Sequence, residues 1–243
     1  MRAMAFERIN VLNKNGLRDY ASYIAAGDLC QIGEKEVNGL WPVTYPTSKG
    51  RKTRWVRSLN GFLCNQNEYA SLSYPAKGYE GATIKSGGCG VCASVNAVGA
   101  LTGKCVPVRA MRDLAVNGRA RVPGGTDMAQ MMTLVCRDYG LKYRTTSSIY
   151  EMQQHLKNGG VAICNVAGKG MFSTGGHYVT ALGYLGGKLC IADSGMYAGK
   201  YSANAKRKAA VTVSGDLIFA SAATLDTDCV GRWPRYYLLS KGG

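Results

Sequence analysis

The sequence has few residues of the kind that commonly serve acid–base chemistry, since its 243 residues include only two histidines, at positions 155 and 177. Any histidine-dependent chemistry must therefore use His155 or His177. The chain also lacks an apolar run close to the roughly 18 residues that a membrane-spanning helix needs. Its first ten residues are polar and mixed, without the apolar region of a signal peptide. These absences predict a soluble chain that does not span a membrane.

Acidic residues are also scarce. Fifteen Asp and Glu face thirty Lys and Arg, which gives a net charge of +15. Basic residues outnumber acidic ones two to one both before and after residue 66, so no single tail carries the excess. Such a balance favours a polyanionic partner: nucleic acid, an anionic bacterial wall or an acidic membrane surface. Composition does not choose among these, but 46% hydrophobic residues exclude a disordered chain.

The nine cysteines are odd in number and scattered along the chain. A secreted disulfide framework would favour an even number at dense spacing. Cys164 and Cys190 lie inside apolar, strand-like runs, where a thiol serves as a small core residue. The cysteines therefore favour a protein made in a reducing cytoplasm.

The texture of the chain changes between residues 60 and 70. Before this point, short apolar runs alternate with turn signals such as Asn15-Gly16, which favours a small β-barrel. After it, helical and strand-like segments are mixed. We therefore expect an α+β fold with an all-β domain at 1–63 and a mixed domain at 64–243. The expected strands are 9–12, 21–24, 29–32, 41–46, 53–57, 161–166, 178–184 and 188–192, and the expected helices are 90–101, 128–139 and 149–157.

Cys89 lies in a glycine-rich loop immediately before the first of these helices. A thiol at a helix N-terminus meets the positive end of the helix dipole, which lowers its pKa and favours the reactive thiolate. The flanking glycines would let a substrate approach the backbone closely. The alternative is a tight loop with an incidental core cysteine.

Cys89 and Cys92 also form a Cys-Gly-Val-Cys motif, which raises two competing interpretations. A redox dithiol would need a preceding strand, and Gly87-Gly88 is a poor strand end. A zinc site would need a second Cys-x-x-Cys or a pair of histidines, and the sequence has neither. We therefore expect no metal and no cofactor.

His177 and Asp193 lie at the outer ends of two apolar strands joined by a glycine turn. A two-residue turn would place Asp193 opposite Thr180, on the face away from His177. A three-residue turn would place it opposite Val179, on the face of His177. The sequence allows both registers. His155, among polar neighbours, is expected to be a solvated surface residue.

Cys89, His177 and Asp193, in this order, suit thiol-based acyl transfer. The histidine would take the thiol proton and later protonate the leaving amine, and the aspartate would fix the imidazole tautomer.

Residues 64–243 resemble papain-superfamily cysteine peptidases of the branch related to bacteriocin double-glycine leader peptidases. The resemblance rests on Gln66, the segment 83–92 around Cys89, Gly175-Gly176-His177 and Ala192-Asp193-Ser194. It implies that Cys89 is the nucleophile, His177 the base, Asp193 the residue that orients His177, and Gln66 the oxyanion donor. The chain departs from the family form in having Val91-Cys92 where Pro-Thr is common. It also has Thr83 near the usual place of the glutamine, so Gln66 is the nearest candidate and Asn65 and Asn67 are alternatives.

The first domain resembles a bacterial SH3-like wall-binding module through residues 43–56. The stretch 49–57 has five basic residues, no acid and one tryptophan, Trp55. It would be an anion-binding strand pair or a solvated hairpin face, and nucleic-acid binding by stacking on Trp55 is the less favoured option.

This pairing of modules is similar to that in lysins of phages that infect Gram-positive bacteria. It implies an endolysin that cleaves a peptide or amide bond of peptidoglycan through a thioester on Cys89. Its partners would be peptidoglycan and anionic wall polymers, and it would stay in the host cytoplasm until lysis and then act at the cell wall. The alternatives are a processing cysteine peptidase for a leader or protein substrate, and a non-catalytic wall- or nucleic-acid-binding protein.

Overall fold

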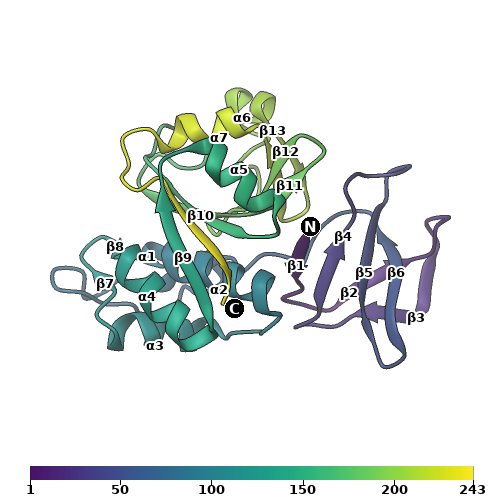
Figure 1. Ribbon diagram of the computed structural model, residues 1–243, viewed down its shortest axis with the longest axis horizontal. Helices are drawn as coiled ribbons and strands as arrows, with labels where there is room; N and C mark the ends of the chain where they lie inside the picture. The colour runs from purple at the N-terminus through teal and green to yellow at the C-terminus, as the bar shows by residue number, and fades with distance from the viewer. Residues whose placement is uncertain (243) are drawn as a thin grey trace.

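Two antiparallel sheets organise the chain (Figure 1). In the computed structural model, which describes residues 1–242, residues 2–56 build a six-stranded N-terminal sheet and residues 141–241 build a seven-stranded C-terminal sheet. Most helices come from the sequence between the two sheets or from the loops of the second one. The expected mixed α+β architecture, with an all-β sheet first, is confirmed.

The N-terminal sheet has the strand order β1-β4-β5-β6-β2-β3. Along β5, Trp41, Val43 and Tyr45 are buried and alternate with more exposed residues, as expected of a sheet with one face on a core. The strands expected at 9–12 and 29–32 form with these bounds. Strand β1 was not expected, since three residues are too short for a visible alternation. The strands are β1 (Arg2–Met4), β2 (Ile9–Leu12), β3 (Arg18–Ile24), β4 (Leu29–Ile32), β5 (Trp41–Thr47) and β6 (Gly50–Val56).

The C-terminal sheet has the order β13-β14-β12-β11-β10-β15-β9 and is covered on both faces. Ile163 of β10 packs in the cluster that contains helix α2, whereas its neighbour Cys164 packs with residues of α5 and α7. Burial on both faces explains why its central strands have almost continuous apolar sequences. The strands are β9 (Leu141–Thr146), β10 (Val161–Val166), β11 (His177–Leu185), β12 (Lys188–Ala192), β13 (Val211–Ser214), β14 (Leu217–Ala220) and β15 (Tyr236–Lys241), and a separate hairpin joins β7 (Arg121–Val122) to β8 (Gly125–Thr126).

The three expected helices form as α2, α4 and α5, and Gly103 and Gly140 end α2 and α4 in the left-handed conformation. Helices α1, α3, α6 and α7 were not expected. Helices α1 and α6 are too brief for a visible periodicity, whereas α3 has a helical pattern that was missed, with Val108, Met111 and Ala115 buried on one face. Within residues 1–242, no helix combines the length and the apolar character that crossing a membrane requires. The helices are α1 (Ile84–Gly87), α2 (Cys89–Thr102), α3 (Val108–Asn117), α4 (Met128–Tyr139), α5 (Ile149–Lys157), α6 (Ala205–Ala210) and α7 (Ala222–Cys229).

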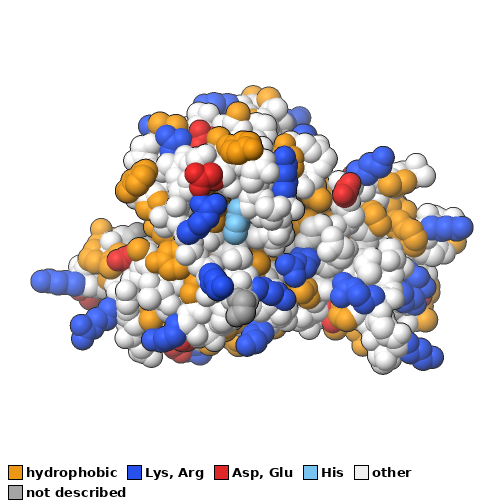
Figure 2. Space-filling view, viewed as in Figure 1, with side chains coloured by type: hydrophobic (Ala, Val, Ile, Leu, Met, Phe, Trp, Pro, Cys, Tyr) orange, Lys and Arg blue, Asp and Glu red, His pale blue; other side chains and the backbone are white. Residues whose placement is uncertain are grey.

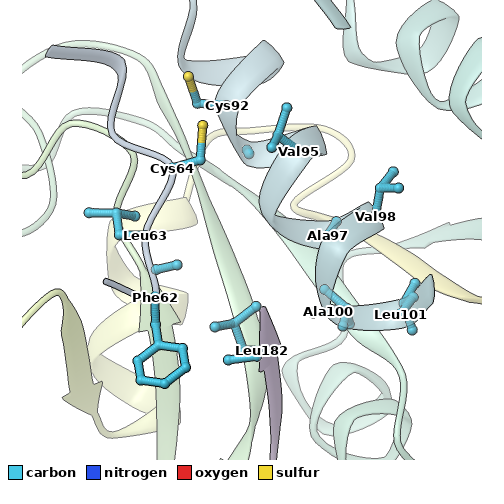
Figure 3. Packing of buried hydrophobic residues seen from close by; sticks show 14 of the residues in the cluster. Phe62, Leu63, Cys64, Cys92, Val95, Ala97, Val98, Ala100, Leu101 and Leu182 are labelled. Atoms are coloured by element: carbon cyan, nitrogen blue, oxygen red, sulfur yellow. The ribbon is translucent and has the colours of Figure 1, made fainter. Parts of the chain in front are cut away.

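Helix α2 is the centre of the larger hydrophobic cluster and is buried from Gly90 to Leu101. Figure 3 shows the segment that follows the N-terminal sheet, including Phe62 and Cys64, packed alongside this helix. Strand β1 also packs on it: a Cβ added at Gly99 would stand 2.7 Å from Met4 Cε. The same cluster contains residues of both sheets, so one core joins them.

The expectation that His155 is a solvated surface residue is wrong. His155 is half-buried at the end of α5, and its Nε2 lies 2.7 Å from the backbone oxygen of Leu239 in β15. Burial is the main cause that lowers its pKa. The His155 ring therefore links α5 to β15 of the C-terminal sheet, a strand that lies far from α5 in the sequence.

Candidate active site

Cys89 is the first residue of α2, and the turn that places it there depends on glycine. Gly88 ends α1 and also precedes α2, with its N–H bonded to the Ile84 oxygen at 2.8 Å. A Cβ at Gly88 would stand 2.6 Å from that oxygen, and one at Gly90 would stand 2.8 Å from Thr126 Cβ. These two glycines thus allow the chain to pack closely on itself, rather than on a substrate as the sequence suggested.

Cys89 is half-buried as a residue, and its thiol lies within hydrogen-bonding reach of His177. Burial raises the pKa of a thiol, but here it is outweighed. The hydrogen bond and charge of His177, with the backbone N–H groups of Tyr178 and Gly90, hold the pKa of Cys89 below its ordinary value. The arrangement favours a thiolate, as a nucleophile at a helix N-terminus requires.

His177 contacts Asp193 directly: its Nε2 lies 2.8 Å from Asp193 Oδ1, and the side chains are only 8% and 0% exposed. Since Nε2 faces the carboxylate, Nδ1 is the nitrogen left for the Cys89 thiol. The sequence expectation that Cys89, His177 and Asp193 share one site agrees with this geometry.

The register that brings His177 and Asp193 together is the one expected of a three-residue turn, but it forms in a different way. The turn has two residues, Gly186 and Gly187, with Leu185 paired to Lys188. A β-bulge between Ala181 and Gly183 then shifts the pairing by one residue, so that Thr180 lies opposite Ala192. One step further, Asp193 comes opposite Val179, on the same face as His177. The favourable register thus comes from a short turn combined with a bulge.

Charge and hydrogen bonding set the protonation of His177. Burial alone would lower the pKa of an imidazole. The hydrogen bonds with Asp193 and Cys89 outweigh burial and raise the pKa of His177 to about 9. The raised pKa of His177 and the lowered pKa of Cys89 both favour an imidazolium beside a thiolate, and the two groups titrate as a coupled pair.

Asp193 has two further side-chain partners that the sequence did not indicate. Its Oδ2 accepts hydrogen bonds from Lys200 Nζ at 2.5 Å and from the Tyr201 hydroxyl at 2.6 Å. Although burial opposes ionisation, the hydrogen bond and charge of His177 and the charge of Lys200 hold the pKa of Asp193 far below its usual range. The sequence signal for such a partner is a lysine in the loop that follows a buried acid, because a buried carboxylate requires partners.

Gln66 lies beside this group, in a short 3-10 helix (Gln66–Glu68). Its backbone N–H donates to the Ser194 oxygen at 2.7 Å. The Ser194 hydroxyl lies 3.5 Å from both Gln66 Oε1 and the Cys89 oxygen. Gln66 Nε2 donates to the Lys85 oxygen at 2.8 Å, which uses one of its two amide hydrogens.

The side-chain amides of Asn65 and Asn67, the two alternatives to Gln66 as oxyanion donor, are engaged elsewhere. Asn65 and Asn67 both donate their side-chain amides to the backbone oxygen of Met196, each at 2.8 Å. They hold the loop that follows Asp193. Gln66 is thus the amide of the three that approaches Cys89, through Ser194.

Cys92, the second cysteine of the motif, points into the core beside Cys64 (Figure 3). Its hydrogen bond with Cys64, with burial and the proximity of Cys64, raises the pKa of Cys92 well above the ordinary value. All nine cysteines are free. Among residues 1–242, no three His, Cys, Asp or Glu side chains gather in a way that could hold a metal ion.

The basic stretch of the N-terminal sheet borders an open groove of about 890 Å³ between β3 and the β5–β6 hairpin. Lys49, Arg51 and Lys52 line this groove. Part of the stretch also has internal partners, since Arg54 Nε lies 2.5 Å from Asp19 Oδ2. Trp55 is half-buried and pairs with Pro42 within the sheet.

No family model matches the chain, and no curated protein matches it in sequence.

Proposed function

We propose that the chain is a cysteine-dependent peptidoglycan hydrolase of the endolysin type, which cleaves a peptide or amide bond of the bacterial wall. The observation that carries the proposal is the placement of Cys89 at the start of α2, in contact with a His177 whose other ring nitrogen is held 2.8 Å from Asp193. This arrangement combines an activated nucleophile, a proton carrier and a residue that orients the carrier.

The reaction proceeds in two halves. The Cys89 thiolate attacks the carbonyl carbon, and the His177 imidazolium donates its proton to the leaving amine, so that a thioester forms and the C–N bond breaks. The neutral ring then takes a proton from water, whose oxygen attacks the thioester and releases the acid and the thiol. The backbone N–H of Cys89 and the free amide hydrogen of Gln66 stabilise the negative oxygen of each tetrahedral intermediate.

Charge supports the wall as the substrate. The net charge is +15, and Figure 2 shows Lys and Arg side chains spread over both parts of the molecule with few acidic ones between them. Bacterial walls rich in anionic polymer attract such a surface. The basic groove bordered by Lys49, Arg51 and Lys52 supplies a place for this attraction away from the catalytic residues.

The test is digestion of purified Gram-positive peptidoglycan by the wild-type chain, by Cys89→Ala and by the matched variant Cys92→Ser, with new termini identified by mass spectrometry. A free lactyl group on muramic acid indicates an amidase, and a new peptide amine indicates an endopeptidase. Either product, lost in Cys89→Ala and kept in Cys92→Ser, supports the proposal. Equal product from Cys89→Ala would contradict it. No wall product from the unmodified wild-type chain, when a separate sample shows that its Cys89 reacts selectively with iodoacetamide, would favour a processing peptidase.

A further inference from the structure

The carboxylate of Asp193 has a partner for each of its four lone-pair positions. Oδ1 accepts from His177 Nε2 at 2.8 Å and from the Gly195 N–H at 2.9 Å. Oδ2 accepts from Lys200 Nζ at 2.5 Å and from the Tyr201 hydroxyl at 2.6 Å. One oxygen therefore serves the catalytic ring, and the other is held by a cation and a hydroxyl group.

Lys200 is unusual because it is only 6% exposed. Lysine is almost never buried without a partner, and Lys200 has two, Asp193 Oδ2 and the Gly195 oxygen at 3.1 Å from Nζ. Its backbone is also held, since Arg207 donates to the Lys200 oxygen at 3.1 Å. The position of the ammonium group is thus fixed from both ends of the residue.

This inference rests on the proposed function. We propose that Lys200 is a positioning residue: it holds Oδ2 of Asp193 so that Oδ1 faces His177, and it balances the carboxylate when the imidazolium gives up its proton. Lys200 touches neither the ring nor the thiol in any hydrogen bond, so it acts through Asp193.

The charges of the site show why this balance matters. At rest, thiolate, imidazolium, carboxylate and ammonium sum to zero. When the thioester forms and His177 passes its proton to the leaving amine, the first two charges disappear together. Without Lys200, a buried and unpaired carboxylate would remain, which is costly, and Asp193 would therefore keep the proton on His177. Lys200 makes the proton easier to release.

The other groups that face this pair do not replace the ammonium. From β11 and α2 come His177 and Cys89, which are the reacting pair. Tyr201 contributes a neutral hydroxyl, since burial and the nearby Asp193 raise its pKa. Arg207 of α6 lies over the Tyr201 ring, 6.0 Å from its centroid, and Asp228 of α7 also faces Tyr201.

The experiment titrates the two imidazole rings by NMR, with His155 as an internal reference, in a Cys89→Ala background where His177 senses only the Asp193 side. The variants are Lys200→Met, Lys200→Arg, Tyr201→Phe and, as a control, Lys188→Met, which removes an exposed lysine of β12. Lys200→Met should raise the pKa of His177 by about one unit and leave His155 unchanged. Lys200→Arg and the control should stay within a few tenths of the parent. With Cys89 restored, the alkaline limb of kcat/KM in Lys200→Met should move upward in parallel.

A folded Lys200→Met with an unshifted His177, or a Lys200→Arg shifted as far as Lys200→Met, would overturn the proposal. If Lys200→Met does not fold, Tyr201→Phe decides: the loss of one hydrogen bond to Oδ2 should raise the pKa of His177 by less than one unit, and no change would count against the proposal. The NMR titration requires no substrate. A shifted His177 in a chain that leaves peptidoglycan intact would therefore refute the wall activity alone.

Discussion

Trp41 of the N-terminal sheet stacks on Phe219 of the C-terminal sheet, with ring centroids 5.1 Å apart and planes 9° from parallel. A second link lies nearby, where Asp216 Oδ2 accepts a hydrogen bond from the Gly61 N–H at 2.6 Å. Both contacts join residues far apart in the sequence. The first sheet therefore supports the half of the chain that carries the candidate site.

Trp41→Ala is expected to lower the free energy of unfolding by about 3–5 kcal/mol, because it removes a buried ring and leaves a cavity between the sheets. Trp233→Ala is the matched control, since Trp233 is 84% exposed and its loss should change stability by less than about 0.5 kcal/mol. Urea unfolding followed by circular dichroism measures both. Equal stability of the two variants would show that the stacked pair does not join the sheets.

Iodoacetamide at neutral pH is expected to alkylate Cys89 ahead of the cysteines whose pKa is raised by burial. Its pKa is lowered, whereas burial raises the pKa of Cys30 to about 12 and that of Cys136 to about 11. Peptide mass spectrometry gives the rate at each site. His177→Ala should slow Cys89 and leave the exposed Cys105 unchanged. If Cys89 reacted no faster than Cys136, the thiol would not be activated.

The rate of cleavage is expected to fall as the pH rises through about 9, where His177 loses the proton it must donate. The same raised pKa has a consequence for stability. Interactions of the imidazolium stabilise the fold fully below its ordinary pKa of 6.5, and this stabilisation is lost as the pH rises through about 9. A profile of kcat/KM from pH 5 to about 10 tests the first point, with chelators expected to have no effect. An alkaline limb near pH 6.5 would mean that Asp193 and Cys89 do not stabilise the charged ring.

Gly88→Ala is expected to abolish most activity, since the new Cβ would stand 2.6 Å from the Ile84 oxygen and displace the start of α2. Gly87→Ala is the control one residue earlier, where the nearest atom to a new Cβ is Arg121 Nη2 at 3.8 Å. Activity and thermal unfolding should be compared for the two variants. An active Gly88→Ala would show that the nucleophile tolerates a shifted turn.

Gln66→Ala is expected to lower kcat by roughly 10²–10³ with little change in KM, because the amide stabilises the oxyanion more than the ground-state carbonyl. Steady-state kinetics on a soluble wall fragment measures both constants. A loss below tenfold in kcat would assign the oxyanion to another donor.

Local signals predicted much of the fold. Helices α4 and α5 begin and end where polar caps and the following glycine or asparagine suggest, and β10 and β12 match their apolar runs. The short helices α1, α6 and α7 were not predicted, because tertiary packing rather than periodicity stabilises them. Helix α3 was missed although Val108, Met111 and Ala115 repeat at helical spacing. The shared core was not predicted either. The alternation along β5 indicates that one face of the strand is buried, but it does not identify the residues that pack against this face.

The candidate site was predictable to a similar extent. Cys89, His177 and Asp193 each carry a local signal, such as a helix start or a strand end. The bulge that aligns two of them has none, because Leu182 looks like any other apolar strand residue. Lys200 and Tyr201 were not predicted, because a lysine in the loop after a buried acid is a weak signal and their role depends on how that loop folds back over Asp193.

The bulge also shapes how this hairpin can change by insertion and deletion. Strand β11 pairs without interruption with β10, from Ala162–Ala181 to Val166–His177, so β10 alone decides which way His177 points. The extra residue at Leu182 reconciles the two-residue turn with the pairing beyond it. Deletion of Leu182 would remove the bulge and leave Ala181 opposite Ile191, so that Asp193 stays opposite Val179 and the site keeps its geometry. A one-residue deletion between Cys190 and Asp193 would instead bring Asp193 opposite Thr180, on the other face, and inactivate the site while both strands remain.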